Sequence, residues 1–155
     1  MPVMRLRRFR EEDREAVWQL HNLALEQVGA HAGNGPWDDD LKAISVTYLE
    51  RGGEFVVGVE GSRIMAMGAL LPREPGRAEI KRMRVHPGVH RRGFGRRVLH
   101  HLEERAVQLG CQTLVLDTTV EQQAAQALYL GEGYKETGRR EAERFALIFF
   151  EKHID

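Results

Sequence analysis

Residues 78–99 read AEIKRMRVHPGVHRRGFGRRVL, and this stretch decides the fold. Together with Arg77, its first part alternates side chains as a β-strand does and ends at Val85, just before a His-Pro pair. From Gly95 onward, apolar residues recur at helical spacing as far as Gly110. A short apolar run at residues 113–116 is typical of a buried parallel strand. The stretch therefore predicts a β-α-β unit with a glycine-containing loop after its first strand.

The alternation also predicts which side chains of the first strand share a face. One face is expected to carry Ala78, Ile80, Arg82 and Arg84. The opposite face is expected to carry Glu79, Lys81, Met83 and Val85.

The loop before the helix has the chemistry of a phosphate-binding site. The first N–H groups of a helix have no partner within the helix, and the helix dipole adds partial positive charge there. Gly93 and Gly95 let the backbone approach a ligand without a Cβ, and mobile cations are supplied by Arg91, Arg92, Arg96 and Arg97. The alternative is a tight loop beside a solvated basic helix end. ATPase and dinucleotide loops fit worse, because neither G-x-x-x-x-G-K-[ST] nor G-x-G-x-x-G occurs here.

The rest of the chain predicts a mixed α/β fold of the α+β kind, in one domain over residues 1–155. About six to seven strands and four helices are expected. Strands are predicted at residues 3–9, 54–59, 63–71, 134–138 and 145–152, and helices at residues 11–28, 38–49 and 121–130. Asp38, Asp39 and Asp40 are explained as the acidic N-terminus of the second helix, which would end at Gly52 and Gly53.

The composition excludes several classes of partner. Lys plus Arg and Asp plus Glu both number 23, so no net charge favours a nucleic acid or an anionic membrane. There is no signal-peptide core and no apolar run of membrane-spanning length, so a cytoplasmic location is expected. The single cysteine, Cys111, excludes an intramolecular disulfide and is predicted to be a small buried thiol. No metal site is predicted, because His100 and His101 are adjacent on a helix and face different directions.

Two motifs in the right order resemble the GNAT superfamily of N-acetyltransferases. The family's cofactor loop, Q/R-x-x-G-x-G/A, corresponds to residues 90–95, where His90 departs from the usual first residue. The family's second motif, N-x-x-A-x-x-L-Y-x-x-x-G-F, falls on Gln122, Ala125, Leu128, Tyr129, Gly133 and Tyr134. Gln122 and Tyr134 are mild departures. The resemblance spans residues 54–138.

This resemblance implies that acetyl-CoA is the cofactor and that the fourth and fifth strands are parallel but splay apart. Pantetheine would enter between them and pair with the fourth strand, and the loop amides would hold the pyrophosphate. The residues implied for the cofactor are Met83, Arg84, Val85, His90, Arg91, Arg92, Gly93, Phe94, Gly95, Arg96, Gln122 and Tyr129. The amine acceptor would attack the thioester directly in a ternary complex.

The resemblance also assigns candidate catalytic residues. Glu79, in the triplet AEI, matches the glutamate that acts as general base in the histone-modifying branch, although it could simply pair with Lys81 or an arginine. Tyr129 matches the tyrosine whose hydroxyl serves the cofactor sulfur, against the alternative of core packing. A backbone N–H near Val85 is the expected oxyanion donor. Substrate contacts are expected from His31, Asn34 and Trp37 in the glycine loop and from Asp117, unless Asp117 caps the next helix.

The leading hypothesis is an N-acetyltransferase for a primary amine of a small molecule or peptide. The chief alternative is a non-catalytic acyl-CoA-binding or sensing module on the same fold, which the retained Tyr129 disfavours. A nucleic-acid-binding domain built on the arginine-rich loop lacks interleaved aromatic residues and a basic net charge. No membrane partner is expected, and a homodimer is one open expectation for the oligomeric state.

Overall fold

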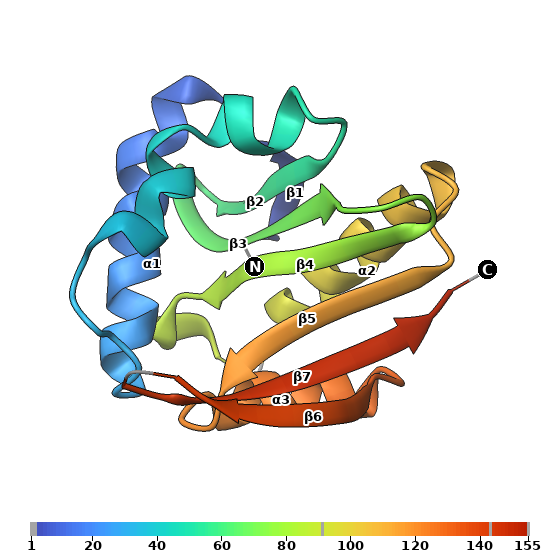
Figure 1. The fold of residues 1–155 in the computed structure, drawn as a ribbon. Coiled ribbons are helices and arrows are strands. Elements are labelled where there is room, and N and C mark those ends of the chain that lie inside the picture. The colour runs from blue at the N-terminus through green and yellow to red at the C-terminus, as the bar shows by residue number, and fades with distance from the viewer. Residues whose placement is uncertain (1–2, 91, 143, 155) are drawn as a thin grey trace.

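A seven-stranded mixed sheet forms the centre of the protein (Figure 1). The computed structural model describes residues 3–90, 92–142 and 144–154. The sheet order is β1-β2-β3-β4-β5-β7-β6, and every neighbouring pair is antiparallel except β4 and β5. The strands are β1 (Arg5–Arg8), β2 (Glu54–Glu60), β3 (Arg63–Pro72), β4 (Arg77–Val85), β5 (Thr113–Thr119), β6 (Lys135–Glu141) and β7 (Ala146–His153). The predicted mixed sheet with one parallel pair is confirmed.

Helices cover both faces of this sheet. The described residues form the α-helices α1 (Arg14–Gln27), α2 (Phe94–Gln108) and α3 (Gln123–Gly131). Figure 1 shows α2 and α3 behind the sheet and α1 along its left side. Apolar residues of α2 and α3 form one core with the sheet, and α1 with residues 41–48 forms a second core on the opposite face. None of the described helices is long and apolar enough to cross a membrane.

The predicted second helix at residues 38–49 is wrong in its hydrogen bonding. The chain instead forms a 3-10 helix, η2 (Pro36–Lys42), and a short π-helix, η3 (Ser45–Leu49), separated by Ala43 at φ −144°. Two further 3-10 turns are η1 (Glu11–Asp13) and η4 (Pro87–Val89). The apolar periodicity still identified the buried residues, because Leu41, Ile44 and Tyr48 lie in the core. Periodicity reports which side chains are buried, and it does not fix the hydrogen-bond spacing.

The predicted alternation along β4 is wrong beyond Lys81, because the strand contains a β-bulge. Gly68 of β3 faces two residues of β4, since Met67 pairs with Arg84 and Ala69 pairs with Lys81. The backbone strain of the bulge lies at Arg82, whose φ is +58°. Arg82 is the one described residue other than glycine with a positive φ. The extra residue reverses the alternation. Ala78, Ile80, Met83 and Val85 consequently share the α2 face, whereas Arg82 and Arg84 point toward η2 and α1.

The predicted splay of the two parallel strands is confirmed. β4 and β5 pair only at Arg77–Thr113, Ala78–Leu114 and Glu79–Val115, although both strands continue well beyond these positions. In Figure 1 the two ribbons lie side by side at the right and diverge toward the left. The edge of β4 that faces β5 is therefore left without a strand partner after Glu79.

A substitution at Gly68 tests how closely α2 packs against the sheet behind the bulge. A Cβ at this position would lie 2.6 Å from Val98 Cγ1, 2.8 Å from Met83 Sδ and 3.0 Å from Leu102 Cδ1. We expect Gly68→Ala to lower the free energy of unfolding by about 1–3 kcal/mol, because the core must shift to accept the methyl group. The measurement is urea unfolding of this variant beside Gly138→Ala, a strand glycine where an added Cβ would have no described atom within 4 Å. Equal stability of the two variants would contradict the close packing.

Candidate active site

A cleft of about 660 Å³ opens where β4 leaves β5, bounded by the end of β4, the start of α2 and one side of α3. It brings together most residues predicted to bind the cofactor: Met83, Arg84, Val85, His90, Gly93, Phe94, Gly95, Arg96, Gln122 and Tyr129. Arg92 does not line the cleft. Its guanidinium donates to Glu60 at 2.7 Å and lies over the Phe94 ring. Arg91 lies outside the described residues.

The start of α2 forms the anion-attracting end of the cleft. Gly93 is the N-cap residue with φ +78°, and no side chain of residues 3–90, 92–142 or 144–154 caps the helix there. The first amides of α2 are thus free of a side-chain acceptor, and they carry the positive end of the helix dipole. Gly95 has a packing role as well, because an added Cβ would lie 3.3 Å from Leu128 Cδ2 and 3.5 Å from Val85 Cγ2. It lets α2 approach α3 and β4 closely enough to close the wall of the cleft.

Tyr129 is both a core residue and a donor facing the cleft. Its ring is buried against Tyr134 and Phe150, with centroids 5.8 and 5.9 Å away. Among the described residues its hydroxyl has no hydrogen-bond partner, whereas the hydroxyls of Tyr48 and Tyr134 donate to Asp40 and Glu103. Burial raises the pKa of Tyr129, an effect that Arg84 opposes and Asp117 reinforces. The phenol therefore keeps its proton at neutral pH.

Two carboxylates stand where the sheet opens. Glu79 is held by Arg73, whose Nε and Nη2 both donate to Glu79 Oε1. Asp117 lies on β5, two residues after the last β4–β5 pair. Desolvation, and then the charge of Glu79, raise the pKa of Asp117, although the residue is exposed on the surface. Asp117 does not cap α3, because the N-cap residue is Gln122. The sequence left open that Glu79 pairs with an arginine, and the structure shows this pairing with Arg73. Because Arg73 contacts only Oε1, Oε2 of Glu79 has no hydrogen bond among the described residues.

A buried polar network lies behind the opening, and sequence reasoning missed it. His21 Nε2 lies 3.0 Å from Asp38 Oδ1, and Arg84 Nε donates to His21 Nδ1 at 3.3 Å. Arg82 donates to both oxygens of Asp40, at 2.7 and 2.9 Å. Asp38 and Asp39 do lie in the first turn of a helix, the 3-10 helix η2, but that position does not account for all three aspartates. Asp38 accepts a hydrogen bond from α1, and Asp40 accepts hydrogen bonds from β4. One signal was available, since His21 occupies the apolar stripe of α1, where a polar residue needs a partner.

The protonation of His21 follows from its surroundings. Burial, and then the charges of Arg84 and Arg82, lower the pKa of His21 to about 4, although Asp38 opposes them. The ring is consequently neutral at physiological pH. Because Nδ1 accepts a hydrogen bond from Arg84, the ring proton resides on Nε2 and is donated to Asp38.

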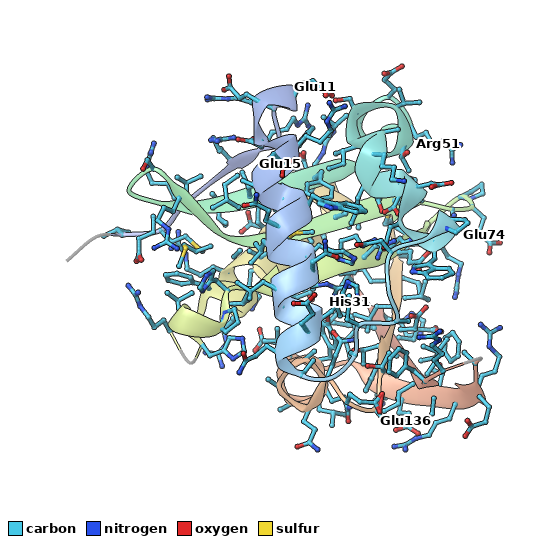
Figure 2. All side chains as sticks on the ribbon, turned by 90° about the vertical axis from the view of Figure 1, so that its left-hand side faces the viewer. Glu11, Glu15, His31, Arg51, Glu74 and Glu136 are labelled. Carbon is cyan, nitrogen blue, oxygen red and sulfur yellow. The ribbon has the colours of Figure 1, made fainter. Side chains whose placement is uncertain are left out.

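The glycine loop residues predicted to touch substrate do not line the cleft. His31 Nε2 and Asn34 Nδ2 both contact Asn22 Oδ1, at 2.8 and 2.9 Å, and Trp37 Nε1 donates to the Gly33 carbonyl at 3.0 Å. Figure 2 shows His31 beside the lower end of α1. In this arrangement the three side chains hold the loop together, and their contact with an acceptor stays a prediction.

The sequence profile of the Acetyltransferase (GNAT) family matches residues 11–134, which is well over half of the chain. The chain belongs to this family. Its similarity to rat N-acetyltransferase 8F1 is 32% identity over 106 residues, covering 65% of this chain and 48% of that protein. The chain is also 34% identical to the IAA acetyltransferase of Azospirillum brasilense over 85 residues, which cover 54% of this chain and 56% of that protein. The chain spans about half the length of these curated relatives.

Solved structures of acetyltransferases share the fold of this GNAT protein. A GNAT acetyltransferase from Staphylococcus aureus Mu50 superposes with a TM-score of 0.90 at 16% identity, covering 98% of this chain and 99% of that one. The yncA acetyltransferase of Salmonella typhimurium, solved with its cofactor acetyl-CoA, superposes with a TM-score of 0.79 at 20% identity, covering 99% and 95%. At these identities the likeness concerns the fold alone.

The GNAT family uses acetyl-CoA, and the cleft fits this cofactor in three respects. The uncapped start of α2 suits a pyrophosphate, the unpaired edge of β4 suits an extended chain with amide groups, and the apolar walls from Met83, Val85 and Leu128 suit its methylene groups. Within the described part of the chain, a Cβ added at Gly93 would have no atom within 4 Å, so the approach there is open.

Arg96 tests the phosphate end of the cleft. We expect Arg96→Glu to weaken coenzyme A binding about tenfold, because it places a negative charge beside the start of α2. The readout is the rise in melting temperature that coenzyme A causes by binding the folded state. Arg139→Glu is the matched control, since Arg96 and Arg139 are 63% and 59% exposed and each pairs with a glutamate. Equal losses in both variants would mean that only net charge matters, and no loss in Arg96→Glu would place the phosphates elsewhere.

Proposed function

We propose that this GNAT protein transfers the acetyl group of acetyl-CoA directly to a primary amine of a small molecule or peptide, with both substrates bound together. The observation that carries this proposal is the Tyr129 hydroxyl, a protonated donor at the cleft wall without a partner among the described residues. A module that only binds or senses acyl-CoA has no need of such a donor. The hydroxyl is not sealed in the core, because it is absent from the buried polar atoms that lack a partner, so a ligand in the cleft can reach it.

The residues of the chain have separate tasks in this reaction. When bound, acetyl-CoA supplies an acetyl group activated as a thioester. The start of α2 and the edge of β4 bind and orient it, and the apolar wall excludes water around the reacting end. Tyr129 Oη holds a proton that it can donate where negative charge develops on sulfur.

The carboxylates at the opening would prepare the acceptor amine. An ammonium has no lone pair, so it must give up a proton before it can attack. Glu79 is paired with Arg73 through Oε1 and retains Oε2 for that proton, whereas the raised pKa of Asp117 suits it to holding a proton. We assign Glu79 as the general base and Asp117 as its neighbour on the acceptor side.

Tyr129→Phe tests the donor without disturbing the packing of the ring. We expect turnover to fall by about 10²-fold or more, the low end of general acid contributions, because charge on the departing sulfur loses its donor. Coenzyme A affinity and melting temperature should change little. Steady-state kinetics with any accepted amine, together with a coenzyme A thermal shift, measure both quantities. A variant that turns over at the parent rate would reduce Tyr129 to a packing residue.

Glu79→Gln and Asp117→Asn together identify the base through the pH profile. We expect Glu79→Gln to lower kcat/KM by about 10²-fold near neutral pH and to recover as the pH approaches the pKa of the amine, which then needs no base. Asp117→Asn should shift the profile less. If Asp117→Asn shows the alkaline recovery instead, the base is Asp117. Parallel profiles for Glu79→Gln and the parent would leave Glu79 a structural role only.

A further inference from the structure

Arg84 carries a charge that no carboxylate of the described residues neutralises. Its Nε donates to His21 and its Nη1 donates to the Met83 carbonyl at 2.9 Å, and no Asp or Glu oxygen of the described chain lies within 4.0 Å. The contrast with Arg82 is direct, since Arg82 is two residues away and is fully paired with Asp40. Of the five N–H groups of Arg84, three remain without a protein acceptor.

The surroundings of Arg84 cannot supply the missing charge. Burial, and then the charge of Arg82, lower the pKa of Arg84 to about 10, so the guanidinium still carries its proton at neutral pH. His21 is neutral, and both Asp38 oxygens are taken, by His21 and by Asn34 at 2.9 Å. Buried charges are ordinarily paired, so a cation left over in a cleft marks a place for an anion.

The network fixes the direction of the guanidinium. Asp38 orients the His21 ring, and the ring in turn accepts from Nε, while Nη1 donates to the Met83 carbonyl. Arg84 lines the cleft together with Tyr129, and it is not among the residues whose unpartnered polar atoms are sealed from solvent. Its free N–H groups therefore face space that a ligand can reach.

We propose that Arg84 binds a carboxylate of the acceptor, so that the acceptors of this protein are amino acids or other primary amines carrying a nearby carboxylate. This inference rests on the proposed function. One uncompensated positive charge matches a single negative charge, and the planar fork of a guanidinium matches a carboxylate in two parallel hydrogen bonds. The same charge disfavours polyamines and aminoglycosides, which would bring further cations next to Arg84 and Arg82. His21 is a positioning residue for Arg84.

The free N–H groups could alternatively face the acetyl carbonyl of the cofactor, and matched acceptors separate the two cases. The common α-amino acids, β-alanine and γ-aminobutyrate are compared with their carboxamides, which keep the amine and lose the charge. Turnover with acetyl-CoA gives kcat and KM for each pair. Calorimetry in the presence of coenzyme A gives the affinity for each acceptor without any reaction.

For the parent protein we expect a preference of about 10²-fold for the carboxylate member of the best pair, in KM and in affinity. Arg84→Gln should abolish that preference by weakening the carboxylate member alone, with both members of each pair measured at saturating coenzyme A. Arg84→Lys keeps the positive charge and loses the planar guanidinium, so this variant should retain part of the preference for the carboxylate member. His21→Gln should reduce the preference through KM and not through kcat. Arg63→Gln, on the neighbouring strand β3, is the control and should behave as the parent.

Each result decides the inference. Equal binding of carboxylates and carboxamides by the parent overturns it, even where amines are acetylated. An equal loss on both members in Arg84→Gln also overturns it, because Arg84 would then act on the acetyl group or on the fold. Arg84-dependent binding of carboxylates without any acetylation would support the inference and contradict the proposed function.

Discussion

Strand β4 loses its β5 partner after Glu79, and the cleft between β4, α2 and α3 depends on that loss. Backbone N–H and C=O groups in the middle of a sheet need partners, so the opened edge must be satisfied by water or by a ligand. β3 still pairs with β4, and β7 still pairs with all of β5, so the opening is confined to two facing edges. The sheet thus keeps its continuity on both sides of one local gap, and that gap is where an extended ligand could pair with β4.

Because of the bulge at Arg82, one face of the end of β4 is apolar and the other carries two arginines. On one face, Met83 and Val85 continue the apolar core and wall the cleft. On the other, Arg82 and Arg84 point toward α1 and η2. A left-handed backbone at a non-glycine residue costs about 1–2 kcal/mol. Hydrogen bonds from Arg82 to Asp40 and to the Trp37 carbonyl offset that cost and tie η2 to the strand.

The irregular segment before β2 is explained by these same contacts. A regular helix at residues 38–49 would present its aspartates to solvent at an N-terminus, whereas η2 turns Asp38 and Asp40 inward. There they accept from His21, Asn34, Arg82 and Tyr48, so buried charge and buried hydroxyl groups are mutually satisfied. The network leaves Arg84 as the one member whose charge is not matched among the described residues, and Arg84 is the member that reaches the cleft.

The sequence by itself determined the β-α-β unit, the mixed sheet and the glycine loop, because each depends on a local pattern of a few residues. The place of Tyr129 came from the resemblance of its motif to the GNAT superfamily. Helix periodicity, turn glycines and the spacing of the two motifs depend on near neighbours along the chain. Only the tertiary structure decided where the arginines of β4 point and what the aspartates bind. A single bulge, opposite Gly68 and packed under α2, reverses the alternation that the pattern predicts. The partners of Arg82 and Arg84 lie 42 and 63 residues away in the chain, and contacts at that separation form only when the packing of the whole sheet brings α1, η2 and β4 together.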